Sequence, residues 1–227
     1  MQLNFDFLQP LLLASKMTLL LAGCSLALGL LIALALTIAQ RSHCRLLGRL
    51  ATTFALFIRG LPELLVLLLL YFVPTQLLHL LTQRYINFNP FGCGVTALAL
   101  IFAAYATETL QGALQAVNPG HIDAAKALGL KRQGIFWHIL LPQAWRYALP
   151  GLGNHWLVLL KDTAIVSLIN INELMRQTQI ASLATGKPLT YFLFAALIYL
   201  LITLISQWLL TRLRMFACRF EQNGHLA

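Results

Sequence analysis

Residues 17–39 read MTLLLAGCSLALGLLIALALTIA, a run of 23 residues without a charge. A bilayer core about 30 Å thick is crossed by a helix of about 20 apolar residues. The run is therefore long enough to span a membrane. The preceding residues, MQLNFDFLQP, contain no basic residue, whereas a secretory signal peptide begins with a positively charged region. We therefore expect a retained first helix.

The rest of the chain is also rich in apolar residues. Of its 227 residues, 59% are hydrophobic and 10% are charged, and the mean hydropathy is +0.76. This leaves too little polar surface to cover a water-soluble globule of that size. Four further apolar runs follow the first, at residues 50–73, 93–116, 148–171 and 189–211. We predict an all-α membrane protein with about five transmembrane helices, forming a single domain over residues 1–227.

Basic residues are unevenly distributed between these runs. Most of them follow the first, third and fifth runs, namely Arg41, Arg45, Arg49, Lys126, Lys131, Arg132, Arg146, Arg212, Arg214 and Arg219. The segments after the second and fourth runs hold only Arg84, Arg176 and Lys187. Positive residues mark the cytoplasmic side of a membrane protein. We therefore predict a periplasmic N-terminus and a cytoplasmic C-terminus. The net charge of +9 is explained by this topology, so we expect the chain to contact membrane lipid and not nucleic acid.

A polar stretch, HIDAAKALGLKRQGIFWHILLPQA at residues 121–144, separates the third and fourth runs. Asn118 and Pro119 are typical of a helix start, and Gly129 suits the left-handed conformation that follows a helix end. A second short helix is expected over residues 131–140, closed by Pro142 because proline ends helices.

The predicted cytoplasmic loop, residues 118–145, is too short and too charged to span a bilayer. Its small residues would allow the backbone of another protein to come close. An amphipathic segment with basic residues can also rest on lipid headgroups. The residue pattern leaves both interpretations open.

The spacing of seven residues in this loop resembles the EAA loop of permease subunits in bacterial ATP-binding-cassette (ABC) importers: Asp123, Ala124, Ala125, Gly129, Ile139, Leu141 and Pro142. Only the first position differs, with aspartate in place of the usual glutamate. In that family the loop contains a coupling helix that sits in a groove of a cytoplasmic ATPase subunit. The resemblance therefore implies that these seven residues couple the chain to an ATPase.

Other segments agree with this resemblance. Arg59-Gly60-Leu61-Pro62 is similar to the RGxP segment of polar amino acid permeases. The chain is likewise similar to these permeases at Ala104-Tyr105, Glu108, Gly112-Ala113, Ala148-Leu149-Pro150, Gly153-Asn154 and Leu160-Lys161-Asp162-Thr163. The histidine/arginine permease family, and within it the arginine permeases, looks most similar. The resemblance implies the type I ABC importer permease fold and transport of arginine or another basic amino acid across the bacterial inner membrane.

The chain lacks the phosphate-binding motif G-x-x-x-x-G-K-[ST], because Gly186-Lys187 has no glycine five residues earlier and is followed by Pro188. We therefore expect no enzyme activity and no cofactor in this chain. The resemblance implies a separate cytoplasmic ATPase dimer that uses ATP and Mg²⁺, and a periplasmic amino acid binding protein. Five helices are few to enclose a polar path, which favours a second copy of the chain or a related permease subunit as a further partner.

Five charged residues interrupt the apolar runs: Arg59, Glu63, Glu108, Lys161 and Asp162. A charge near the bilayer centre costs at least about 2.5–3.5 kcal/mol and so must face protein or a water-filled cavity. Arg59 and Glu108 lie about 14 Å and about 12 Å from the cytoplasmic ends of their runs, at 1.5 Å per residue. We predict that these two form an ion pair, with a structural role favoured over a role in transport.

Glu63 follows Arg59 by four residues and would share its helix face. It would either share that arginine or present a carboxylate to a cationic substrate. Lys161 and Asp162 are neighbours and point about 100° apart on a helix, so they cannot neutralise each other across a turn. By charge complementarity, Glu63, Glu108 or Asp162 would contact a cationic group, and Arg59 or Lys161 a carboxylate.

Small residues are expected at two packing sites. In the first run, Gly23 and Gly29, with Ala22, Ala27 and Ala33, predict a close helix contact. In the fourth run, Gly151 and Gly153 follow Pro150, which is consistent with either a flexible entry or close packing.

The sequence offers little support for other classes of protein. An autonomous secondary transporter or channel for small polar solutes is the main alternative, but such transporters often contain internal repeats and we see none. A membrane enzyme would need a motif such as G-x-S-x-G or H-E-x-x-H, and neither occurs. The four cysteines and six histidines are scattered, so no disulfide or metal site is indicated.

Overall fold

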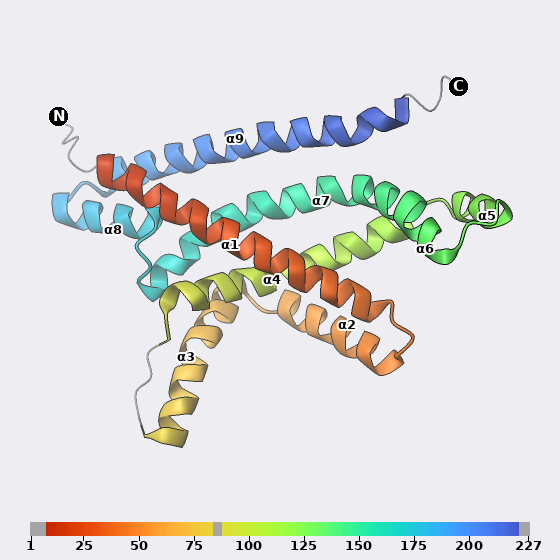
Figure 1. Cartoon of the computed structure of the whole chain (residues 1–227). Helices are drawn as coiled ribbons and strands as arrows, with labels where there is room; N and C mark the ends of the chain where they lie inside the picture. The colour runs from red at the N-terminus through yellow and green to blue at the C-terminus, as the bar shows by residue number, and fades with distance from the viewer. Residues whose placement is uncertain (1–7, 84–87, 223–227) are drawn as a thin grey trace.

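The computed structural model describes residues 8–83 and 88–222, and all regular structure within these ranges is helical (Figure 1). The elements in chain order are α1 (Leu8–Gln40), α2 (Arg45–Gly60), α3 (Glu63–Thr82), α4 (Pro90–Gln115), α5 (Pro119–Ala127), α6 (Arg132–Ile135), a π-helical segment (Phe136–Leu140), α7 (Leu141–Asp162), a 3₁₀ segment (Thr163–Ile169), α8 (Leu174–Thr185) and α9 (Pro188–Gln222).

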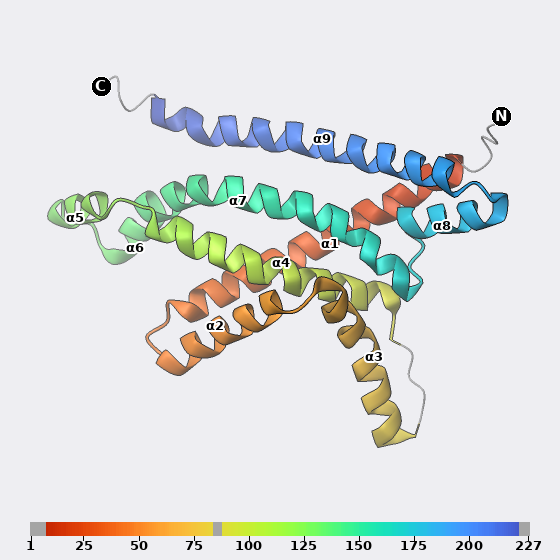
Figure 2. The same cartoon turned by 180° about the vertical axis from the view of Figure 1, so that it is seen from behind.

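Helix α4 is the centre of the packing. It contacts α1, α2, α3 and α7, and Figure 2 shows it running between α7 and α2. Many of its buried residues are small: Gly94, Ala97, Ala99, Ala103, Ala104, Ala106 and Ala113. Small side chains allow helix backbones to approach closely, which favours association in a membrane, where lipid tails are as apolar as leucine.

Among the described residues, four helices are long and apolar enough to cross a bilayer by length and composition, namely Gln9–Gln40, Glu63–Thr82, Pro90–Gln115 and Pro188–Met215. They contain the predicted first and fifth spans and all but the last residue of the third. The predicted fourth span, residues 148–171, corresponds to the second half of α7 and the 3₁₀ segment. Helix α7 has 22 residues, so it is long enough to span, but it is less apolar than the other four.

The predicted second span, residues 50–73, is wrong as a single helix. Helix α2 ends at Gly60, and Leu61 is extended with φ −96° and ψ 144°. Because the ring of Pro62 disfavours the helical conformation of the residue before it, the chain changes direction there. With 16 residues, α2 reaches only about 24 Å and is too short to cross a bilayer. Glu63 becomes the first residue of α3.

The loop over residues 118–145 begins as expected. The Asn118 side chain accepts a hydrogen bond from the Gly120 N–H at 2.9 Å, with Pro119 as the first residue of α5. Gly129 follows α5 with a φ of +77°, a value that glycine adopts without strain. The Leu130 N–H then donates to the Ala125 carbonyl at 3.1 Å, as in a Schellman motif. The predicted start and stop of the first helix are confirmed.

The end of the second short helix was predicted incorrectly. Pro142 does not close it, because α6 continues through the π-helical segment into α7. The Leu141 N–H donates to the Phe136 carbonyl, five residues back. Proline cannot donate the usual bond to the residue four positions earlier. The π-turn next to Pro142 leaves the helix unbroken and joins the loop directly to α7.

The two ends of the molecule differ in charge. The α1–α2 turn, α5, α6 and the last turns of α9 lie at one end, whereas the start of α1, α8 and the start of α9 lie at the other (Figures 1 and 2). Most of the basic residues assigned to the cytoplasm are at the first end. Arg84 and the side chain of Arg219 lie outside the described residues. The orientation in the membrane stays a prediction.

Glu173 joins three helices at the end opposite to α5. Its side chain is fully buried and forms the N-cap of α8, accepting from the Arg176 N–H at 2.8 Å and the Met175 N–H at 2.9 Å. The Tyr199 hydroxyl of α9 also donates to it at 3.1 Å, and the Thr18 hydroxyl of α1 at 3.4 Å. A buried carboxylate needs such partners, so this group fixes α8 against α1 and α9.

The predicted glycine contacts are partly confirmed. A Cβ on Gly29 would lie 2.8 Å from Phe102 Cδ1 and 3.0 Å from the Ala99 carbonyl oxygen, so α1 and α4 touch here. Around Gly23 there is open space. In α7, a Cβ on Gly151 would lie 2.5 Å from Thr109 Cγ2, and one on Gly153 would lie 3.0 Å from an Arg214 nitrogen. Close packing therefore explains both glycines of α7.

We predict that Gly29→Leu destabilises the protein and that Gly23→Leu does not. The leucine at residue 29 would overlap the Phe102 ring and the α4 backbone, and overpacking of this kind costs about 1–3 kcal/mol. The control adds the same side chain to the same helix where nothing lies within 4 Å. Thermal unfolding of the purified chain in detergent measures the difference. Equal melting temperatures for both variants would contradict the α1–α4 contact.

Candidate functional site

A pocket opens where α3, α4 and α7 meet. It is lined by Glu63 from α3, by Ile101, Phe102 and Tyr105 from α4, and by His155, Val158, Leu159 and Asp162 from α7. The break at Pro62 places Glu63 at the start of α3, next to α7. The α4 and α7 residues recur every three or four positions and so share one helix face. The result is an apolar and aromatic wall with a few polar groups, as in most small-molecule sites.

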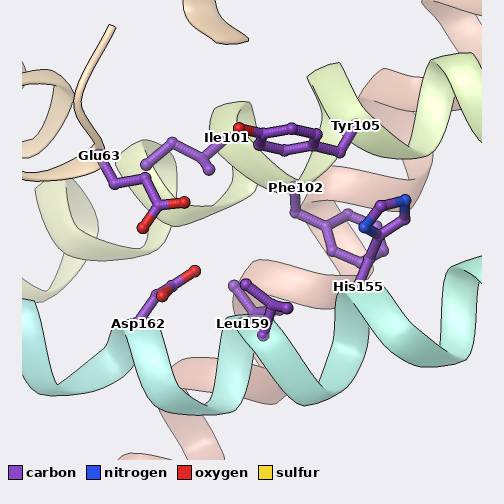
Figure 3. A pocket seen from close by; sticks show the side chains of 8 residues that line it. Glu63, Ile101, Phe102, Tyr105, His155, Leu159 and Asp162 are labelled. Carbon is purple, nitrogen blue, oxygen red and sulfur yellow. The ribbon is translucent and has the colours of Figure 1, made fainter.

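Two carboxyl groups face each other at one side of this pocket. Glu63 and Asp162 point toward one another (Figure 3), and both line the pocket. Two carboxylates that face each other repel, so the arrangement favours either a shared proton or a cation between them. The pocket therefore suits a ligand with a positively charged group.

An aromatic and histidine cluster forms the other side. The His155 Nε2 atom lies 2.9 Å from the Thr109 hydroxyl. The His155 ring also lies beside the rings of Tyr105 and Phe102, with centroid distances of 5.8 Å and 6.3 Å. These contacts connect α7 to α4 and fix the ring that borders the pocket. Flat ring faces at this position can contact the aliphatic part of a ligand.

The predicted ion pair is present beside the pocket. The Arg59 guanidinium contacts the Glu108 carboxylate, and it also lies over the Tyr105 ring at 5.6 Å from the centroid. The Glu108 side chain is 62% exposed and that of Arg59 is 30% exposed. Within this chain the pair is therefore only partly covered. Tyr105 belongs both to the pocket and to the surroundings of Arg59, so the two groups of residues are adjacent.

The structure separates the other predicted charges. Glu63 does not share the helix face of Arg59, because the helix breaks between them; its carboxyl group faces Asp162 instead. Lys161 is exposed and is not among the residues that line the pocket. This agrees with the expectation that Lys161 and Asp162 point in different directions. Of the five charged residues in the apolar runs, Glu63 and Asp162 form the pocket, and Arg59 and Glu108 border it.

The residues of the predicted coupling loop lie at the basic end of the molecule. Asp123, Ala124 and Ala125 are on α5, with Ala125 buried and the other two exposed. Gly129 is in the following turn, Ile139 is in the π-helical segment, and Leu141 and Pro142 begin α7. Asp123 Oδ1 accepts from Lys126 Nζ at 2.8 Å within α5. Large apolar side chains are exposed nearby, with Leu128 at 81% and Trp137 at 63%.

Most of the residues around the pocket were missed in the sequence. His155, Phe102 and Thr109 were not considered as site residues, and Tyr105 was noted only within a motif. A histidine inside an apolar run is an available signal, because a titratable group there needs a polar partner. No group of three or more potential metal ligands occurs among residues 8–83 and 88–222.

The chain is similar to known permeases over nearly its whole length. The family model for the inner membrane component of binding-protein-dependent transport systems matches residues 25–214. The arginine ABC transporter permease protein ArtQ of Haemophilus influenzae is 50% identical over 218 residues, which is 96% of this chain and 98% of the relative. The ArtQ protein of Escherichia coli K12 is 45% identical over 231 residues, covering 94% and 97% of the two chains.

Solved structures show the same fold. A crystal structure of an amino acid ABC transporter with histidines superposes with a TM-score of 0.85 at 31% identity, covering 95% of this chain and 99% of the other. The MetNI methionine ABC transporter, in an inward-facing conformation, gives a TM-score of 0.67 at 16% identity over 91% and 93% of the chains, which supports the fold alone. The predicted ABC importer permease fold is confirmed. The chain belongs to the family of binding-protein-dependent transport system inner membrane components and is a permease subunit of an ABC importer.

Proposed function

We propose that this chain carries arginine or another basic amino acid across the bacterial inner membrane. The observation that carries the proposal is the pair of carboxyl groups, Glu63 and Asp162, which face each other in the pocket between α3, α4 and α7. A guanidinium or ammonium group between them would neutralise two like charges at once. The similarity to arginine permeases at 45–50% identity supports the same class of substrate.

The proposed binding mode uses the rest of the pocket as well. The aliphatic part of the substrate side chain would pack against Phe102 and Tyr105, and the cationic end would lie between the carboxyl groups. On charge grounds Arg59, which lies over the Tyr105 ring, would contact the substrate carboxylate, whereas Lys161 is exposed and does not line the pocket. Because Arg59 already contacts Glu108, we favour a structural role for that pair.

Energy for transport would come from partners. We propose that a cytoplasmic ATPase dimer, using ATP and Mg²⁺, binds the loop through Asp123, Ala124, Ala125, Gly129, Ile139, Leu141 and Pro142. The exposed apolar side chains of this loop support a protein surface as its contact. A periplasmic amino acid binding protein would deliver the substrate at the opposite end. A second copy of this chain, or a related permease, would complete the translocation path.

We predict that uptake depends on the ATPase and on the loop. Vesicles containing the chain, its ATPase and its binding protein should accumulate labelled arginine only with ATP. In the Gly129→Asp variant the rate of this uptake should fall by a factor of about ten or more, equivalent to 1.4 kcal/mol. The substitution adds a charge at the proposed contact and strains a left-handed turn. Labelled lysine, histidine and glutamine in parallel define the substrate range.

Gly186→Asp is the matched control for this experiment. Gly186 is also left-handed, with a φ of +66° and open space around it, but it follows α8 at the opposite end. Equal losses in both variants would mean that backbone strain, and not the loop, is responsible. Arginine uptake without ATPase or binding protein would support an autonomous transporter and would contradict the proposal.

We predict that Asp162→Asn and Glu63→Gln reduce arginine uptake by about tenfold or more relative to glutamine uptake, since each removes a charge facing the cation (1.4 kcal/mol per tenfold). The ratio of arginine to glutamine transport is the measurement. A general folding defect lowers both rates together and leaves the ratio unchanged. An unchanged ratio with well-folded variants would show that these carboxyl groups do not select the substrate.

We predict that the Arg59–Glu108 pair stabilises the permease. Arg59→Glu and Glu108→Arg should each lower the melting temperature and the uptake, because each places like charges in contact. The double variant that exchanges the two charges should recover much of both. The same measurements on all three variants test this. A double variant that recovers stability but no uptake would assign the pair a role in transport.

A further inference from the structure

The coupling helix α5 has few contacts with the rest of the chain. It contains nine residues, of which only Ala125 is buried. Its principal contacts are with α6 and the π-helical segment, and it lies at the tip of the molecule (Figures 1 and 2). A helix this short gains most of its stability from packing and not from its own propensity. Its orientation therefore depends on the specific contacts that connect it to the membrane helices.

A side-chain hydrogen bond crosses from α5 to α7. His121 Nδ1 lies 3.0 Å from Gln143 Oε1, and the two residues are 22 positions apart in the chain. His121 is in the first turn of α5, and Gln143 is in the first turn of α7. The bond closes the loop between them into a ring. By contrast, the bonds from Lys126 to Asp123 and from His138 to the Gly134 carbonyl stay within one turn.

Helix α7 extends from this bond to the pocket. His155 is 12 positions after Gln143, which is about 18 Å along a helix, and Asp162 is its last residue. Because the π-helical segment leads into α7 without a break, this helix forms one path from the loop to the pocket. The backbone on the other side of α5 turns at Gly129, whose left-handed conformation involves no packed side chain.

We propose that His121 and Gln143 are positioning residues that fix the coupling helix α5 to α7, so that displacement of α5 by the ATPase is passed to the pocket. This proposal rests on the proposed function of the loop. Without the bond, α5 can turn about Gly129 without moving α7. ATP hydrolysis then continues, but less of it produces transport. The pair thus determines the coupling between the two activities and not the binding of the partners.

The test uses the complete complex in vesicles, with the binding protein and labelled arginine. His121→Ala and Gln143→Ala should lower the ratio of arginine transported to ATP hydrolysed by about twofold to tenfold, the range expected for the loss of one net hydrogen bond. Copurification with the ATPase should be unchanged. His121→Asn should restore the ratio, because an amide can donate from nearly the position of Nδ1.

His138→Ala is the matched control, because this exposed histidine lies in the same loop but bonds within its own turn. It should keep the ratio of the unmodified complex. If His121→Ala does not reach the membrane, Gln143→Ala removes the same bond from the other side. A ratio unchanged in either alanine variant, or an asparagine variant as defective as alanine, would overturn this inference alone. An unmodified complex without ATP-dependent uptake would overturn the proposed function as well.

Discussion

The close contact of α4 with its neighbours is the constraint on which the rest of the structure depends. At Gly29 the α1 backbone approaches α4 so closely that a single added carbon would meet Phe102 and Ala99. On another face, Gly151 of α7 leaves a similar space for Thr109 of α4. Leucine side chains cannot drive helix association inside lipid, because lipid tails are equally apolar. Small residues and complementary shapes stabilise the association instead. With α1 and α7 held in this way, the residues of α4 and α7 that form the pocket face each other.

The pocket also depends on a break in the chain. Pro62 ends α2 and redirects the chain, and this places the Glu63 carboxyl group opposite Asp162 instead of along the face of Arg59. A charged pair assembled in this manner cannot relax easily, because both carboxyl groups start or end a helix that is packed against α4. The same arrangement keeps the Arg59–Glu108 pair next to Tyr105. Charges that are unfavourable in a membrane are thereby gathered in one place, where a substrate or protein groups can satisfy them.

The two ends of the molecule are built differently. At one end, buried Glu173 holds α1, α8 and α9 together with hydrogen bonds to backbone and side chains. At the other end, α5 has a single buried residue and exposes apolar side chains around it. A firmly packed end at Glu173 and a lightly attached end at α5 fit the proposal that a partner binds at α5. The continuous helix from α6 through the π-helical segment into α7 connects that end of the molecule to the pocket.

The sequence by itself determined the membrane class, the basic loop, the start of α5 at Asn118-Pro119 and the turn at Gly129. These features follow from local chemistry, because run length, capping and left-handed backbone are properties of neighbouring residues. It also identified Arg59 and Glu108 as partners, since matched depth left few alternatives. Only the tertiary structure decided that Glu63 faces Asp162, that His155 and Phe102 line the pocket, and that His121 meets Gln143. Those contacts join residues far apart in the chain. Their geometry depends on how α3, α5 and α7 are oriented by packing, by the break at Pro62 and by the π-turn next to Pro142.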